Sequence, residues 1–141
     1  PVARDRDLGI WDAFVALWER LDMAREELAE GLGVTLLPEM ELHYVRYPAR
    51  GFYQRHVDDH VEPGDRPSRR CVSFICYLTE AEPAWSAADG GQLRVHPGTD
   101  GPAEEYLPES GSLALFDSTA LEHEVMPTQR ERTCLIGWFH T

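Results

Sequence analysis

Eight short runs of β-branched and aromatic residues follow one another between residues 40 and 139, and no helical stretch separates them. Pro, Gly and Asp, the residues that favour turns, divide the runs. Parallel strands need long crossover connections, usually helices, so this spacing argues against a parallel α/β sheet. It predicts a double-sheet jelly roll or a small barrel. The expected strands are 40–47, 52–58, 70–79, 91–96, 104–107, 111–116, 122–126 and 132–139.

One amphipathic helix is expected before the strands, at about residues 10–30. Its apolar residues recur at helical spacing, whereas most of its acidic residues point elsewhere. The stripe consists of Trp11, Phe14, Val15, Trp18, Leu21 and Leu28. Gly31 and Gly33 are expected to end the helix. We therefore expect a mainly β fold, a jelly roll with an N-terminal supporting α-helix and a β core at about 40–140, in one domain of residues 1–141.

The charge balance of the chain restricts the classes of partner that it can bind. Thirteen basic residues stand against 25 acidic residues, which gives a formal net charge of −12. Nucleic acids and anionic membranes are bound through clusters of Lys and Arg, so we expect neither as a partner. No stretch approaches the ~20 apolar residues that span a bilayer. Three cysteines without metal-ligand spacing favour a reducing cytoplasm.

A candidate metal site is formed by three side chains. His56 and Asp58 stand two residues apart, and on a strand this spacing directs both to the same face. His123 is expected at the start of a later strand. Two neutral imidazoles and one carboxylate make the facial triad that binds non-haem Fe(II) and leaves coordination positions open.

His60 is the rival ligand. It would share a face with His56 and Asp58 if the strand continued, but Pro63 and Gly64 indicate that the strand ends before it. A His-x-Asp triplet also occurs by chance in surface turns, so the triplet alone leaves a structural interpretation open.

Arg132 is a candidate anion-binding residue. It follows His123 by nine residues and is expected to open the last strand. A buried guanidinium needs an anion, and the carboxylate of a bound cosubstrate would meet its planar fork in two parallel hydrogen bonds.

The sequence between residues 47 and 139 resembles the catalytic core of a known family. It is similar to the prolyl 4-hydroxylase branch of the Fe(II)/2-oxoglutarate-dependent oxygenases, in particular the oxygen-sensing prolyl hydroxylases and their bacterial relatives. The resemblance is carried, in the family's order, by the segments YPARGFYQRHVD, RRCVSFICYLT, GGQLRVHP, GSLALFDS and HEVMPTQRERTCLIGWF.

The resemblance implies roles for individual residues. It implies a double-stranded β-helix in which His56, Asp58 and His123 hold the iron. By the same match, Arg132 binds the distal carboxylate of 2-oxoglutarate, and Tyr77 donates its hydroxyl to that carboxylate.

Three further residues are expected around the pocket. The resemblance places Tyr47 near the metal end of the cosubstrate. It places Trp138 in the wall of the substrate pocket, although composition alone would assign Trp138 to the core. Ile136 is expected on the same face of the last strand as Trp138.

The resemblance implies an oxidoreductase that uses Fe(II), 2-oxoglutarate and O2, with ascorbate as the expected reductant. We expect hydroxylation of an unactivated C–H bond, most often of a prolyl residue in a protein or peptide, with release of succinate and CO2. A free amino acid is an alternative substrate. A cupin-like metal dioxygenase or isomerase without 2-oxoglutarate and a non-catalytic peptide-binding barrel are alternative functions. The family's oxygen sensors carry a lid before the long helix, where this chain has residues 1–9, so the resemblance supports substrate recognition least and leaves open whether lid residues precede Pro1.

Overall fold

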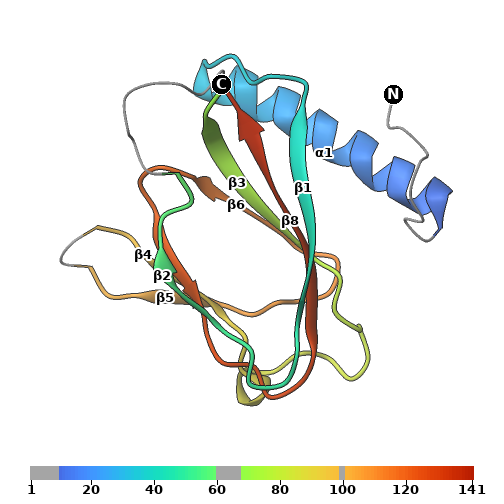
Figure 1. Cartoon of the computed structure of the whole chain (residues 1–141), viewed down its shortest axis with the longest axis vertical. Coiled ribbons are helices and arrows are strands. Elements are labelled where there is room, and N and C mark those ends of the chain that lie inside the picture. Colours follow the sequence, from blue (N-terminus) through green and yellow to red (C-terminus); the bar gives the residue numbers. More distant parts are fainter. Residues whose placement is uncertain (1–9, 60–67, 99–100) are drawn as a thin grey trace. The chain divides into compact units, whose positions relative to one another are not determined.

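The computed structural model describes residues 10–59, 68–98 and 101–141. Its contacts divide the chain into two compact units, Pro1–Pro38 and Glu39–Thr141. The first unit contains the helix and the second contains the strands (Figure 1). The expected single domain of residues 1–141 stays a prediction.

The first unit contains helix α1, Trp11–Leu32. The helix ends at Gly33, which has φ +67° and whose N–H donates to the carbonyl of Glu30. Glycine adopts this left-handed conformation without steric cost. The helix is confirmed, but Gly31 lies inside it because only the residue at the cap needs a positive φ. Within the described residues, no helix combines the length and hydropathy needed to cross a bilayer.

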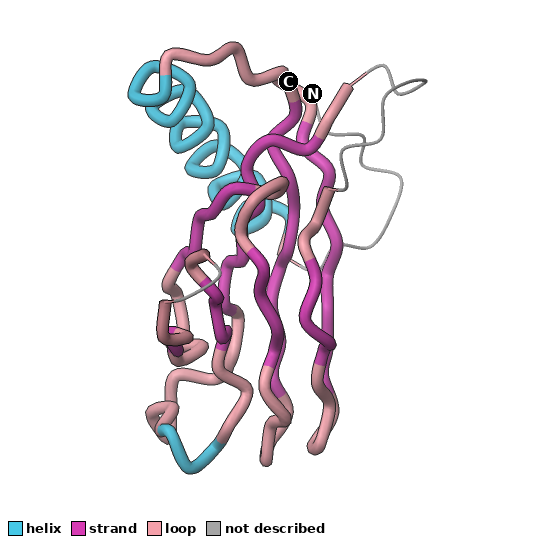
Figure 2. Tube along the Cα trace, turned by 90° about the vertical axis from the view of Figure 1, so that its left-hand side faces the viewer, coloured by secondary structure: helices cyan, strands magenta, loops and turns pink. Residues whose placement is uncertain are grey.

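The second unit is built from two four-stranded antiparallel sheets, as expected for a jelly roll. The first sheet has the order β1 (Met40–Tyr47), β8 (Arg132–His140), β3 (Arg70–Tyr77), β6 (Leu113–Asp117). The second has the order β2 (Tyr53–His56), β7 (Glu122–Val125), β4 (Leu93–His96), β5 (Glu104–Tyr106). A short 3₁₀ helix, η1 (Ala87–Asp89), precedes β4. The axes of the strands are roughly aligned in Figure 2, and paired strands are antiparallel.

The hydrophobic core of this unit lies between the two sheets. Ile75 and Tyr77 of β3 and Cys134 of β8 pack with Leu93 and Val95 of β4. All five are buried. Residues two apart in a strand share a face, and this alternation directs these side chains inward.

Most strands are shorter than the sequence pattern indicates, and two of these differences are explained by nearby contacts. Strand β2 ends at His56, so Asp58 lies beyond it. The chain leaves the second sheet there, and the N–H of Asp59 donates to the carbonyl of Ser118 at 2.9 Å. Strand β4 begins only at Leu93. Gly90 has φ +67°, and a Cβ at this position would lie 2.2 Å from a backbone oxygen.

Candidate metal centre and anion pocket

The structure brings His56, Asp58 and His123 together. His56 ends β2, and its register partner on β7 is His123. Asp58 follows two residues later, and its Oδ1 lies 3.0 Å from Nε2 of His56 and 3.7 Å from Nε2 of His123. One ligand atom from each residue lies within 4.8 Å of the others. No second group of three potential metal ligands occurs among residues 10–59, 68–98 and 101–141.

Backbone carbonyls orient both imidazoles. Nδ1 of His56 lies 2.8 Å from the carbonyl oxygen of Gln54, and Nδ1 of His123 lies 3.0 Å from that of Leu121. A neutral ring that donates from Nδ1 presents a lone pair at Nε2. Such outer contacts fix the tautomer and ring orientation of metal-binding histidines. Both Nε2 atoms therefore face Asp58, which is the arrangement that a metal ion shared by the three residues requires.

Asp58 is held at the oxygen that faces away from the histidines. Its Oδ2 accepts hydrogen bonds from Ser73 Oγ at 2.6 Å and from Trp138 Nε1 at 3.0 Å. Burial acts to raise the pKa of Asp58, but hydrogen bonds with His56 and Ser73 outweigh it and lower the pKa to about 2. The carboxylate is therefore ionised at neutral pH, with Oδ1 directed into the cluster.

The two histidines have opposite pKa shifts. Burial lowers the pKa of His123, so this ring is neutral at pH 7. The hydrogen bond with Asp58 raises the pKa of His56. A metal ion at this site would therefore compete with a proton at His56 rather than at His123.

A cavity of about 790 Å³ contains the three side chains. Its walls come from both sheets, and they include Tyr47, Ile136 and Trp138, the three residues expected around the pocket. His60, the rival ligand, lies outside the described residues.

Arg132 is buried at the start of β8, with 1% of its surface exposed. Its guanidinium carbon lies 4.9 Å from the ring centre of Tyr47 and 5.0 Å from that of Tyr77. Arg132 Nε, Arg132 Nη2 and the Tyr77 hydroxyl have no hydrogen-bond partner in the described part of the chain. Buried donors without partners are costly, and a carboxylate is the ligand whose geometry satisfies a guanidinium fork and a phenol together. The residues present therefore fit a dicarboxylate such as 2-oxoglutarate.

Sequence reasoning missed two partners of Asp58. From the sequence, Ser73 has no expected role in the site, and Trp138 is expected in the core or the pocket wall. A signal for Ser73 was present, because it is the polar residue within the apolar run CVSFICY and alternation directs it inward. The indole contact had no local signal, since Trp138 lies 80 residues from Asp58.

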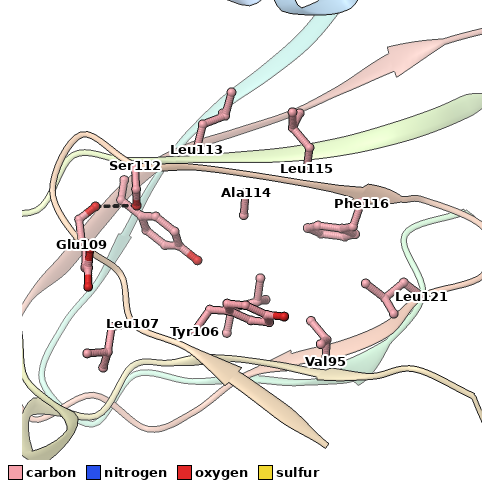
Figure 3. A pocket seen from close by; sticks show the side chains of 12 residues that line it. Val95, Tyr106, Leu107, Glu109, Ser112, Leu113, Ala114, Leu115, Phe116 and Leu121 are labelled. Atoms are coloured by element: carbon pink, nitrogen blue, oxygen red, sulfur yellow. Dashed lines mark hydrogen bonds between the residues drawn. The ribbon is translucent and has the colours of Figure 1, made fainter. Parts of the chain in front are cut away.

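A second hollow, of about 490 Å³, lies beside β5 and β6 (Figure 3). Its labelled walls are mostly apolar, and Ser112 donates a hydrogen bond to the carbonyl of Glu109 at its rim. Tyr77 lines this hollow, and Phe116 lines both this hollow and the metal cavity. Phe116 therefore borders two recesses, and the triad of His56, Asp58 and His123 lines one of them.

Comparison with known proteins agrees with this geometry. A prolyl hydroxylase of hypoxia-inducible factor from Caenorhabditis elegans is 36% identical over 96 residues, covering 66% of this chain and 12% of that protein. A prolyl 3,4-dihydroxylase from Ostreococcus tauri is 32% identical over 83 residues, covering 51% of this chain and 16% of that protein. The chain thus spans less than a fifth of the length of these two relatives.

Solved structures are similar over most of the chain. A Pseudomonas putida prolyl-4-hydroxylase superimposes with a TM-score of 0.79 and 37% identity, covering 95% of this chain and 68% of that one. A Trichoplax adhaerens prolyl hydroxylase, solved with a peptide fragment of hypoxia-inducible factor, gives a TM-score of 0.75 and 27% identity over 90% of this chain and 56% of that one. The family model of the 2OG-Fe(II) oxygenases matches residues 42–140. With this match and the metal-binding triad, the chain belongs to the 2OG-Fe(II) oxygenase superfamily.

Proposed function

We infer that this chain is an Fe(II)- and 2-oxoglutarate-dependent dioxygenase that hydroxylates a prolyl residue of a protein or peptide and releases succinate and CO2. The observation that carries the inference is the pairing of two sites. A complete set of ligands for non-haem iron shares the barrel with a buried arginine whose Nε and Nη2 have no hydrogen-bond partner among the described residues.

Five residues hold the two reagents in this proposal. His56, Asp58 and His123 bind the metal on one side and leave the remaining coordination positions open. Arg132 and Tyr77 bind the distal carboxylate of 2-oxoglutarate. Bound iron supplies the redox chemistry that activates O2, whereas the protein supplies orientation and a dry cavity.

The walls of the cavity keep water from the reacting centre. Val125 and Ile136 line it together with Phe116, and Val125 is buried. Excluding water from such a site strengthens its electrostatic interactions and prevents side reactions. The ionised Asp58 and the neutral His123 need no proton exchange with a substrate, so we assign no general acid or base to the cluster.

A prolyl peptide is the proposed substrate because aromatic side chains stand at the mouth of the cavity. Tyr44 and Tyr53 line it with 66% and 53% of their surfaces exposed. Aromatic-lined grooves accommodate proline-containing extended peptides with little loss of conformational entropy. The relatives named above are prolyl hydroxylases, and one was solved with a peptide bound.

The two alternative functions lack support from the site. A cupin-like enzyme without a cosubstrate has no use for the unpaired Arg132 and Tyr77. A non-catalytic peptide-binding barrel has no use for three oriented metal ligands. Both alternatives predict activity that is independent of 2-oxoglutarate, or no activity.

The test is a search for hydroxylated prolines in a defined mixture. Protein loaded anaerobically with Fe(II) is mixed with ascorbate, 2-oxoglutarate and a cell lysate, and O2 is then admitted. Mass spectrometry should find peptides that gain one oxygen atom on proline, with stoichiometric succinate. The same mixture with His123→Ala protein, or without 2-oxoglutarate, is the control. Equal oxygen incorporation in the controls would contradict the proposal, and modification of free proline alone would replace the peptide with an amino acid.

A further inference from the structure

A charged pair stands at the edge of the metal cavity. Glu41 of β1 and Arg70 of β3 both line it. Arg70 Nε donates to Oε2 of Glu41 at 3.0 Å, and Arg70 Nη2 donates to Oε1 at 2.6 Å. Two parallel hydrogen bonds of this kind hold a guanidinium in one plane and one position. Glu41 therefore determines where the Arg70 head group lies.

Arg70 in turn contacts two residues of the metal site. Its guanidinium carbon lies 3.6 Å from the centre of the Trp138 ring, a cation–π stack. Its Nη1 donates to the backbone carbonyl of Asp58 at 3.2 Å. The position of Arg70 thus restrains both the indole of Trp138 and the backbone of Asp58, the residue that supplies the metal-binding carboxylate.

Trp138 completes the connection to the metal ligand. Its Nε1 donates to Oδ2 of Asp58 at 3.0 Å, beside the 2.6 Å hydrogen bond from Ser73. With Oδ2 engaged twice, Asp58 offers Oδ1 alone to a metal. A carboxylate limited to one oxygen leaves one more coordination position open than a bidentate carboxylate does.

We propose that Glu41 is a positioning residue for the metal centre: by holding Arg70 against Trp138, it keeps Asp58 oriented to bind iron through one oxygen. The proposal rests on the assignment of Asp58 as a metal ligand. Glu41 touches neither the triad nor the proposed 2-oxoglutarate site, so its effect reaches Asp58 through its neighbours. Arg70 is the neighbour that contacts both Trp138 and Asp58. His43, whose Nε2 lies 2.9 Å from Oε1 of Glu41, packs its ring edge-on against Trp138. Partners of this kind outside the ligand set affect metal affinity by about 10- to 100-fold.

Glu41→Gln tests the proposal, because glutamine keeps the size of the side chain but cannot accept both hydrogen bonds as a charged carboxylate. Mn(II) affinity is measured by electron paramagnetic resonance in the absence of 2-oxoglutarate and substrate. We expect about 10-fold weaker binding than in the wild type. In Co(II)-loaded protein, the visible absorption bands should shift, because the carboxylate is freed to bind through both oxygens.

Glu105→Gln is the matched control. Glu105 of β5 accepts two hydrogen bonds from Arg94 of the neighbouring strand β4, at 2.9 and 2.6 Å, and neither residue lines the metal cavity. Mn(II) affinity and the Co(II) spectrum should remain those of the wild type. Equal weakening in Glu41→Gln and Glu105→Gln would overturn the proposal, because it would show a general loss of sheet stability.

Two further variants test the route. The double variant Arg70→Ala/Glu41→Gln should bind Mn(II) as weakly as Arg70→Ala alone. If the two losses of affinity add in the double variant, the proposal is overturned. Trp138→Phe keeps the stacked ring but removes the N–H, and it should weaken Mn(II) binding and shift the Co(II) bands even if Glu41→Gln does not fold. Wild-type protein that fails to bind Mn(II) would refute the metal assignment itself, whereas normal binding with no effect in any variant would refute only the role of Glu41.

Discussion

Replacing Arg132 with methionine should separate the cosubstrate site from the metal site. Methionine keeps an unbranched side chain in the core but removes the guanidinium. In the described part of the protein, the Arg132 head group has one hydrogen bond, a 3.5 Å contact from Nη1 to the sulfur of Cys134. Little hydrogen bonding is therefore lost in the free protein. Removing unpaired buried donors removes a penalty of ~1 to 3 kcal/mol, which offsets the loss of the cation–π contacts with Tyr47 and Tyr77. We expect the free variant to be at least as stable as the wild type.

The affinity for 2-oxoglutarate, in contrast, should fall in Arg132→Met. Removing one partner of a buried charge pair costs ~3 to 5 kcal/mol, since the other charge is left unpaired. At 1.4 kcal/mol per decade, this corresponds to binding weaker by a factor of about 10² to 10³ or more. Arg132→Lys should recover only part of the loss because an ammonium cannot form the fork. Tyr77→Phe removes one hydrogen bond to a charged acceptor and should cost ~1.5 to 3 kcal/mol.

Two measurements on the same samples decide the question. Calorimetric titration of 2-oxoglutarate into Mn(II)-loaded protein gives the affinity, and thermal unfolding without ligand gives the stability. Mn(II) affinity in the absence of 2-oxoglutarate should be unchanged in Arg132→Met. Wild-type affinity for 2-oxoglutarate in this variant would refute the assignment of the distal carboxylate. A parallel loss of Mn(II) binding would show that Arg132 acts through the metal centre instead.

Four other outcomes are expected. Replacing His56, Asp58 or His123 with alanine should each abolish measurable Mn(II) binding, because two ligands remain in a site that must keep open positions; persistence of binding in any one of them would remove that residue from the ligand set. Succinate formation should require Fe(II), with Zn(II) binding as an inert substitute, and full turnover with Zn(II) alone would favour a cupin-like reaction. Burial raises the pKa of Glu41, but hydrogen bonds with Arg70 and His43 outweigh it and lower the pKa from 4.5 to about 2; the stability advantage of the wild type over Glu41→Gln in urea should thus be present above pH 4.5 and vanish as the pH falls towards 2. Gly137→Ala should destabilise the protein by ~1 to 3 kcal/mol in urea denaturation, because the added Cβ would lie 2.2 Å from the carbonyl oxygen of Glu41; an unchanged midpoint would show that β1 moves aside.

The sequence alone determined the order and type of the elements. A 3.6-residue period before residue 33 and eight β-rich runs after it predict one helix and two antiparallel sheets, because local periodicity sets which face of each element is apolar. The same alternation placed Tyr77 and Ile75 on one inward face, as the core shows. The resemblance of local segments also indicated the three metal-binding candidates, which the fold brings within 4.8 Å.

Strand ends were less well determined, because hydrogen bonding between distant segments decides where pairing stops. Asp58 was expected on a strand beside His56, yet β2 ends at His56. The backbone after it bonds to Ser118, which lies in another part of the barrel. Asp58 still faces His56 because the turn, rather than strand alternation, directs it there.

Only the tertiary structure decided which residues surround the metal carboxylate. Glu41 and Arg70 are 29 residues apart in the chain, and Trp138 and Asp58 are 80 apart. Strand β8 lies between β1 and β3, and its register with them places Trp138 opposite both Glu41 and Ser73. No local pattern encodes such a meeting. It arises because sheet register, fixed by the burial of one whole face of each strand, sets the cross-strand neighbours of every side chain.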